Sequence, residues 1–507
     1  MSMLRPFCLA ALVGVLAPAA TAQTVCTDGV AADASGQTYA CDGVDLFARL
    51  TPQQLGAPDF PDCPLRACLN DLWGWTDGST GREYALVGVA NGTAFVDVTD
   101  PAAPRRLGRL PTATGSSTWR DIKTYGDVAY VVSEAGGHGL QVFDLTRLRG
   151  LGEDPDRTFT ADARLTGFGA AHNVVVNTDA GQLAAVGGPC GAGWQMYTLA
   201  DPLAPAFAGC SGDTGYIHDA HCIAYDGPDP DHAGRQVCAG FNNDSVFLVD
   251  TTDPADVTRI ATGFYPNSRY AHQGWFTEDR RYILVNDEDD EGRPGVPNTR
   301  TIVFDVQDLD SPEFVGFYFN PSTSTLDHNL YIRDGVAYQA NYNNGLRVIG
   351  LDGIATADLS ELAFFKTFAG PPDGFNDDFD GAWSVYPYFE SGTVIVSDQI
   401  YGLFTLRVDP ARLPVASAPV PRPSALALSA SSPARAAATV RLTAPAGEPV
   451  RLALYDLLGR ELAVVFDGAG TGAEQTFTVG AGLPAGVAVV RAETAAGSAT
   501  ERITFVR

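Results

Sequence analysis

The chain has 507 residues, with 60 acidic and 33 basic side chains, a formal net charge of −27 and a hydrophobic fraction of 45%. This charge argues against nucleic acid or an anionic membrane surface as a partner. The hydrophobic fraction is that of a folded globular protein and excludes a largely disordered chain.

The first 22 residues have the pattern of an export signal. An apolar run, Leu9–Leu16, follows a basic N-terminus, and the small residues Ala20-Thr21-Ala22 precede Gln23. The run is far shorter than the roughly 20 residues that span a bilayer. We therefore expect a signal peptide at residues 1–22 and no transmembrane span.

Eight of the nine cysteines follow the signal, and an even number in an exported chain indicates disulfides. Several connectivities are open to eight cysteines, and proximity in sequence is the only guide. It predicts the pairs Cys26–Cys41, Cys63–Cys68, Cys190–Cys210 and Cys222–Cys238.

A repeat of about 50 residues organises the chain. A histidine opens a short apolar run at residues 172, 221, 272 and 328, in steps of 49, 51 and 56 residues, and Trp73, Arg120 and Trp383 hold the same position in three more units. Each unit contains short runs rich in Val, Ile, Phe and Tyr, bounded by Gly, Asp, Asn and Pro, which predict strands. We therefore expect an all-β fold with a seven-bladed β-propeller over residues 71–409.

The seventh unit lacks a fourth strand. Val44–Leu50 resembles the fourth strands of the other units, so we expect it to close the ring beside Leu403–Val408. Residues 23–70 are then a disulfide-containing lead-in with its ring-closing strand at 44–50.

The last hundred residues change in composition. Residues 410–437 are rich in Pro and Ala and predict a semi-rigid linker. Residues 438–507 contain short β runs separated by Gly turns, which predict a small β-sandwich.

Two stretches of the chain resemble known families. Leu454–Glu461, Gly482–Val487 and the terminal Val506-Arg507 resemble the type A sorting domain of the type IX secretion system. This resemblance implies that the secretion machinery is a partner and that the protein passes through the periplasm and across the outer membrane of a Bacteroidetes-like bacterium. Asn91–Asp97 and Gly381–Pro387 resemble the choice-of-anchor B proteins with LVIVD-type repeats. That resemblance implies a secreted or surface propeller and brings no known activity.

The repeated histidines are the candidate site. The first strand of a blade is innermost, so residues at its start meet at one mouth of the central channel, together with the turns between second and third strands. Imidazoles with a carboxylate suit Zn, Fe, Mn or Cu. The candidate metal ligands are His172, His221, His272, His328, Glu134, His138 and Asp287. The alternative is that each histidine bonds a neighbouring blade and only holds the ring together.

Two further features bear on the metal. His218 precedes His221 by three residues, a spacing that reverses the face of a strand, so we do not pair them as ligands. The acidic run 287–291 offers the hard oxygen ligands that Ca²⁺ prefers, or else is solvated loop charge. The candidate cofactor is therefore a divalent metal: Zn, Fe, Mn or Ca.

The sequence contains no HExxH, GxSxG or P-loop motif, so no catalytic residue is assigned. We expect a secreted or cell-surface binding module whose channel mouth holds a metal or a small polar ligand, with an unidentified extracellular ligand or protein as partner. The alternative is a metal-dependent hydrolase or lyase that uses the same mouth.

Overall fold

The computed structural model describes residues 23–58, 63–321, 323–369, 379–414 and most of 426–506, where short gaps fall at 433, 436, 445–448, 456–459, 472–474, 482, 484–485 and 495–496. The expected signal peptide lies outside these residues. The described chain is nearly all β, and its two α-helices, Pro52–Leu55 (α1) and Pro189–Ala192 (α2), have four residues each. A search of the described helices for one long and apolar enough to cross a bilayer found none.

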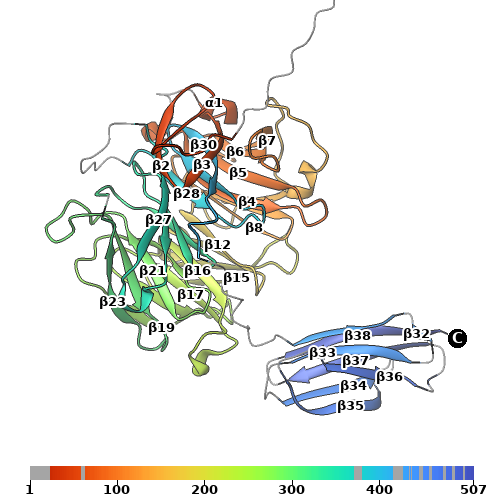
Figure 1. Ribbon diagram of the computed structural model, residues 1–507. Helices are drawn as coiled ribbons and strands as arrows, with labels where there is room; N and C mark the ends of the chain where they lie inside the picture. The colour runs from red at the N-terminus through yellow and green to blue at the C-terminus, as the bar shows by residue number, and fades with distance from the viewer. Residues whose placement is uncertain are drawn as a thin grey trace, which may run out of the picture.

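Strands β4 to β30, together with β3, form a series of antiparallel sheets (Figure 1). In each sheet four strands that follow one another in the chain lie side by side, except that β3 takes the fourth place beside β28, β29 and β30. Their bounds are β4 (Leu69–Thr76), β5 (Glu83–Val89), β6 (Gly92–Asp97), β7 (Arg105–Pro111); β8 (Arg120–Tyr125), β9 (Val128–Ser133), β10 (Leu140–Asp144), β11 (Ala163–Leu165); β12 (Asn173–Asn177), β13 (Gln182–Val186), β14 (Trp194–Thr198), β15 (Ala206–Ser211); β16 (Asp219–Ala224), β17 (Gln236–Phe241), β18 (Val246–Asp250), β19 (Thr258–Gly263); β20 (Ala271–Phe276), β21 (Tyr282–Asp287), β22 (Arg300–Asp305), β23 (Glu313–Phe319); β24 (Asn329–Arg333), β25 (Val336–Ala340), β26 (Leu346–Gly350), β27 (Ser360–Phe365); and β28 (Ala382–Tyr386), β29 (Thr393–Asp398), β30 (Gly402–Val408), β3 (Val44–Leu50).

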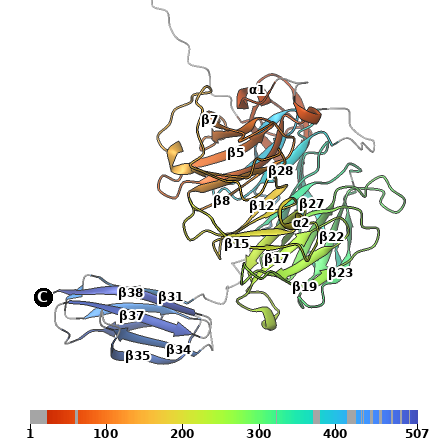
Figure 2. The ribbon, with the colours of Figure 1, turned by 180° about the vertical axis from the view of Figure 1, so that it is seen from behind.

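The first strands of these sheets form a closed ring. Each of β4, β8, β12, β16, β20 and β24 contacts the first strand of the next sheet, and β28 contacts β4. This is the arrangement of a β-propeller, in which sheets pack face to face around a central axis and only short edges are left open (Figure 2).

Burial explains the apolar content of the inner strands. β5 and β6 are buried along their whole length, whereas the outer strand β19 is largely exposed or half-buried. Strands covered on both faces take nearly continuous apolar sequences, and outer strands do not need them. The same order of strands in every unit therefore places the start of each first strand near the axis.

The lead-in segment joins the propeller at two places. β3 pairs antiparallel with β30, with Asp45 opposite Arg407, in the place where the missing fourth strand is expected. β1 (Val30–Ala32) and β2 (Thr38–Asp42) extend a different sheet, because β2 pairs with the outer strand β27. Thus the N-terminal segment covers one outer edge and completes another sheet.

All four predicted disulfides are confirmed. Cys26 bonds Cys41, Cys63 bonds Cys68, Cys190 bonds Cys210 and Cys222 bonds Cys238. Such bonds persist in an oxidising environment, which fits an extracellular or periplasmic protein.

The C-terminal strands form two further sheets around a core of their own. One contains β31 (Ala427–Ala430), β33 (Ala438–Thr443) and β36 (Gln475–Val479); the other contains β32 (Ala434–Arg435), β38 (Gly497–Val506), β37 (Gly486–Thr494), β34 (Pro449–Tyr455) and β35 (Glu461–Ala469).

Two of these strands fall inside the expected linker. β31 pairs with β33 and β32 pairs with β38, so the C-terminal unit takes up residues before 438. Leu426, directly before β31, and Leu428 and Ala430 within it alternate in sequence and pack against the core. The small residues around them conceal this period-2 pattern in the composition.

Candidate functional site

Four imidazoles line one mouth of the central channel as a continuous row. The ring centroids of His172 and His218 are 4.1 Å apart, those of His218 and His272 are 4.0 Å apart, and those of His272 and His328 are 4.2 Å apart. His172, His218 and His328 directly precede the first strands of their sheets, and His272 is the second residue of β20, so the repeat brings the four together.

The row is held by hydrogen bonds that run from each sheet to the next. Nδ1 of His218 lies 2.8 Å from the backbone oxygen of His272, Nδ1 of His272 lies 3.2 Å from that of His328, and Nδ1 of His328 lies 2.5 Å from that of Trp383. A carbonyl only accepts, so Nδ1 donates in each pair and carries the proton. Nε2 of each ring then keeps its lone pair, which is the tautomer that binds a metal.

Two carboxylates lie against the row. Glu134 Oε1 is 2.6 Å from Nδ1 of His172. Glu288 lies between the last two histidines, because its Oε2 is 3.6 Å from Nε2 of His272 and its Oε1 is 3.7 Å from Nε2 of His328. The Tyr342 hydroxyl donates a hydrogen bond to Glu288 Oε1 and orients the carboxylate.

The histidines form the floor of a cavity of about 540 Å³. Aromatic side chains form much of its wall, and Trp119 and Phe379 at its rim are 37% and 46% exposed. The hydroxyls of Tyr216 and Tyr270 are 3.1 Å apart in the same wall. A molecule in this cavity would meet aromatic faces, phenol hydroxyls and carboxylates together with the imidazoles.

Burial keeps three imidazoles of the row uncharged. Burial lowers the pKa of His218 and His272 well below the ordinary histidine value, and it lowers the pKa of His328 to about 3. Burial raises the pKa of Glu288 to about 8. The row thus combines neutral imidazoles with a carboxyl group whose charged form is poorly solvated. A cation bound here would stabilise the charged carboxylate.

Three expected site residues lie elsewhere. The His221 ring stacks on Trp275 at 3.5 Å, and the Phe276 backbone N–H donates to its Nδ1 at 3.1 Å, so it joins two sheets and does not line the cavity. His138 is buried with its Nε2 3.1 Å from Arg120. Asp287 accepts hydrogen bonds from the Tyr265 hydroxyl and two backbone N–H groups.

Two residues of the candidate site, His218 and Glu288, are not among the expected ligands. His218 occupies the position assigned to His221, because β16 begins at Asp219. The signal is the residue after the histidine, which is polar in all four cases: Asn173, Asp219, Gln273 and Asn329. The regular spacing of His221 drew attention away from that pair pattern.

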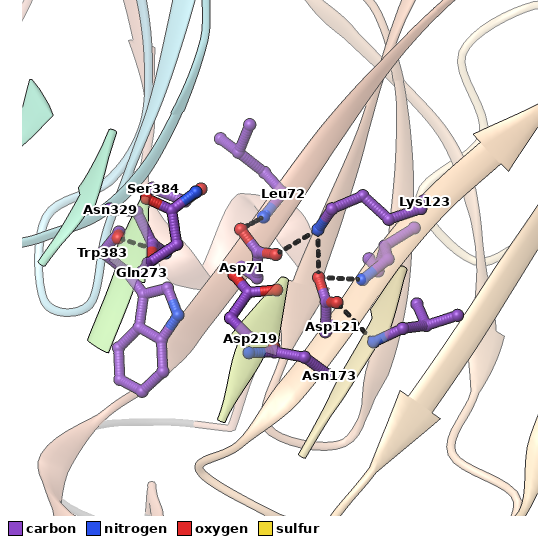
Figure 3. Close-up of polar contacts among 12 residues, drawn as sticks. Asp71, Leu72, Asp121, Lys123, Asn173, Asp219, Gln273, Asn329, Trp383 and Ser384 are labelled. Carbon is purple, nitrogen blue, oxygen red and sulfur yellow. Dashed lines mark hydrogen bonds and ion pairs between the residues drawn. The ribbon is translucent and has the colours of Figure 1, made fainter. Parts of the chain in front are cut away.

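These polar residues belong to a second group, which follows the histidine position in the chain and is drawn in Figure 3. The Asp121 carboxylate accepts from the Val174 backbone N–H of the next sheet at 2.7 Å, and Gln273 Oε1 accepts from the Leu330 N–H at 2.9 Å. One polar side chain per first strand makes up the group: Asp71, Asp121, Asn173, Asp219, Gln273, Asn329 and Ser384.

Lys123 supplies the positive charge of this group. Its Nζ lies 2.6 Å from Asp121 Oδ1 and 3.2 Å from Asp71 Oδ2, with all three side chains buried. Burial raises the pKa of Asp219 to about 7, and the charge of Lys123 opposes that rise. The ammonium thus compensates carboxylates that would otherwise be buried without a counter-charge.

The donor set at the mouth fits a transition metal. Donor atoms of His272, Glu288 and His328 all lie within 4.8 Å of one another. Imidazole nitrogen and carboxylate oxygen are ligands of Zn, and the backbone carbonyls that fix the rings are the outer partners such ligands use.

The comparisons with known proteins give no family. No family model matches the chain, and no curated protein matches it. Among solved structures it is similar to the β-propeller domain of Myceliophteria thermophila Cps50 (Swd1), with a TM-score of 0.42 and 10% identity over 64% of this chain and 93% of that one. It is also similar to the periplasmic gluconolactonase PpgL of Pseudomonas aeruginosa, with a TM-score of 0.42 and 15% identity over 58% of this chain and 84% of that one.

Proposed function

We propose that the protein is an exported seven-bladed β-propeller that acts as a binding module, with a divalent transition metal held at its channel mouth by His272, His328 and Glu288. The metal, in turn, fixes a small polar ligand in the cavity above the histidine row. The C-terminal unit is a β-sandwich that serves export.

The main observation that supports a bound metal is the direction of the hydrogen bonds that the histidines make. Nδ1 of His272 and of His328 donates to a backbone oxygen, so both Nε2 atoms are free to coordinate. Ligands about 2.0–2.1 Å from a tetrahedral ion are about 3.4 Å apart. The Nε2–oxygen separations of 3.6 and 3.7 Å at Glu288 need only a small contraction to reach that value.

The cavity supports the binding role. Three protein donors leave a fourth position of a tetrahedral ion, and the cavity of about 540 Å³ lies next to it. Ligand sites combine apolar and aromatic walls with a few placed polar groups. The aromatic wall with Tyr216 and Tyr270 is of this kind and suits a small ligand with hydroxyl or carboxylate groups.

The export route rests on sequence resemblance and on the disulfides. Four disulfides support an oxidising compartment. The resemblance of the C-terminal unit to type IX sorting domains supports passage across the outer membrane with that machinery as partner. The resemblance to choice-of-anchor B proteins supports a secreted or surface location.

A metal-dependent hydrolase or lyase is the second candidate, and the same open position favours it. Two histidines and one glutamate form a ligand set of catalytic zinc sites, where the remaining position holds water. When bound, such a metal would supply Lewis-acid activation. The chain's own residues would bind the substrate against the aromatic wall, orient it through the Tyr216 and Tyr270 hydroxyls and limit the access of water.

Equilibrium dialysis against Zn²⁺ tests the proposal. The mature chain should bind about one ion per molecule, and His328→Ala or Glu288→Gln should weaken binding at least tenfold. His221→Ala is the matched control, because His221 lies outside the cavity and should leave zinc binding unchanged. Zinc binding that survives His328→Ala, or is lost in His221→Ala, would refute the proposed ligand set.

A further inference from the structure

Three loops beside the mouth are tied together by hydrogen bonds. The Thr299 backbone N–H donates to the Thr323 oxygen at 3.1 Å, and the Thr299 hydroxyl donates to the Thr325 oxygen at 2.5 Å. The Asn344 side chain donates to the Thr325 hydroxyl, also at 2.5 Å. The loop after β21, the segment before β24 and the turn after β25 therefore enclose one shared interior.

This interior contains carboxyl groups from two of the loops. Asp290 and Asp327 are 0% exposed and Glu291 is 3% exposed. The acidic run 287–291 is thus mainly buried, and the alternative of solvated loop charge is wrong for Asp287, Asp290 and Glu291. Burying a carboxylate is costly unless it is paired and hydrogen-bonded.

Among the residues that the structure describes, several oxygens of these groups have no hydrogen-bond partner. They are Oδ1 of Asp290, Oε2 of Glu291 and both carboxyl oxygens of Asp327, and the side-chain oxygen of the fully buried Asn341 is also unpartnered. Native structures contain few such atoms, and an ion or water is the usual explanation for each. A hydrogen bond joins the Asp290 and Glu291 carboxyls when one of them is protonated. Asp327 and Asn341 offer three further oxygen acceptors that no donor in the described chain satisfies, which indicates a cation.

The buried guanidinium nearby does not supply that cation. Arg300 Nε lies 2.5 Å from Oδ2 of Asp290, and its Nη2 lies 3.8 Å from Asp287. The guanidinium's other hydrogen bonds go to the backbone oxygens of Pro266 and Asn267, and the Arg300 backbone N–H donates to Oε1 of Glu291 at 3.3 Å. Arg300 therefore compensates the far side of Asp290 and leaves the Asp327 side of the cluster uncompensated.

Asp327 lies on the segment before β24, which the Thr299 hydrogen bonds tie to the loop that contains the other two acids. Both of its oxygens are wholly buried and have no hydrogen-bond partner among the described residues, so a ligand from outside the chain is needed to satisfy them.

We propose that this interior is a calcium site, separate from the histidine mouth, in which Asp327, Glu291, Asp290 and Asn341 supply the oxygen ligands. Ca²⁺ takes six to eight oxygens at about 2.3–2.6 Å from carboxylates, amide carbonyls and water, and tolerates irregular geometry. The donors here are all oxygens, in contrast to the imidazoles of the mouth, so the two sites select different metals.

The ion would also order the mouth. Glu288 lies on the same loop as Asp290 and Glu291, and the Tyr342 hydroxyl that orients Glu288 follows Asn341 directly. The donor atoms of Asp290, Glu291 and Asp327 do not all lie within 4.8 Å of one another. We therefore expect the ion to draw these side chains together.

Thermal unfolding with and without calcium tests the site. In EGTA followed by excess Ca²⁺, the melting temperature of the mature chain should rise by about 3 °C or more. Asp327→Asn should abolish the rise. Because it removes an uncompensated buried charge, this variant should melt at or above the wild type in EGTA and below it in Ca²⁺. Asp179→Asn, an exposed position on the turn after β12, is the matched control and should respond like the wild type.

Terbium luminescence sensitised by the nearby tyrosines gives a second readout that does not depend on stability. Tb³⁺ should bind the wild type and be displaced by Ca²⁺, and Glu291→Gln should weaken binding at least tenfold. The proposal is overturned if Ca²⁺ changes neither the melting temperature nor the terbium signal of the wild type. It is also overturned if Asp327→Asn responds to Ca²⁺ as the wild type does.

Discussion

Nδ1 of His272 lies 3.2 Å from the backbone oxygen of His328, and this contact between neighbouring sheets fixes what both rings can do. The hydrogen bond places the proton on Nδ1 and turns Nε2 of His272 toward Glu288. The same contact therefore links the sheets and leaves Nε2 available, so one hydrogen bond would serve both the structural role and the proposed metal binding.

His221 should have only the structural role, in which the ring joins two sheets. His221→Ala removes the stack on Trp275 and leaves the Phe276 N–H without its acceptor, which should lower the free energy of unfolding by about 1–3 kcal/mol. Urea denaturation measures this loss. A variant as stable as the wild type would show that the stacked ring does not hold the sheets together.

Lys123 should be essential to the group of polar side chains on the first strands. Lys123→Met leaves Asp71 and Asp121 without their counter-charge and should destabilise the protein by about 3–5 kcal/mol. Adding Asp121→Asn to this variant should recover part of the loss, because one buried charge is removed. If the double variant is less stable than Lys123→Met alone, the charge compensation assigned to Lys123 is wrong.

Asp77 should contribute to stability in a pH-dependent way. Arg149 donates two hydrogen bonds to its carboxylate, at 2.8 and 3.0 Å, and lowers the pKa of Asp77. A lowered folded-state pKa gives stability that is present above the unfolded pKa of about 3.9 and is lost as the pH falls through the folded value.

Asp77→Asn should therefore cost about 1–3 kcal/mol at pH 7 and progressively less below about pH 4. Urea midpoints of both proteins between pH 2 and pH 7 measure the difference. A gap between the two curves that stays constant over this range would contradict the assigned role of the ionised carboxylate.

The ends of the propeller should respond differently to truncation. A chain that starts at residue 60 loses β3 and exposes the edge of β30, so we expect it to aggregate or fold poorly. A chain that ends at residue 414 keeps every propeller strand and should fold, whereas one that ends at 437 retains β31 and β32 without their partners. Size-exclusion chromatography and circular dichroism distinguish these outcomes. Equal behaviour of the 414 and 437 chains would argue against the structural role of β31 and β32.

The repeat made the strand order and the position of the site predictable. Strands with apolar runs between Gly, Asp and Pro turns are local features, and the missing strand of the last unit indicates Val44–Leu50 by elimination. The sequence predicts His221 as a ligand because its spacing fits the period of the repeat. Whether His218 or His221, three residues apart, lines the cavity depends on where the strand begins and on bulges, and the spacing does not encode either. The partner Glu288, and not Asp287, faces the mouth because successive residues at a strand end point to opposite sides.

The burial of the acidic run 287–291 could not be predicted from the sequence, for another reason. Composition predicts solvated charge for five successive acids, and only the packing of three loops that are distant in sequence encloses Asp290, Glu291 and Asp327. Likewise, the role of Lys123 depends on its ion pair with Asp71, which lies 52 residues away in the neighbouring sheet.

The most direct test of the metal centre is a crystal structure of the mature chain soaked with Zn²⁺, with anomalous diffraction recorded on both sides of the zinc edge. We predict one strong edge-dependent peak within about 2.0–2.2 Å of Nε2 of His272, Nε2 of His328 and a Glu288 oxygen. A mouth without such a peak at saturating zinc, or zinc bound through His138 or Asp287 instead, would contradict this prediction.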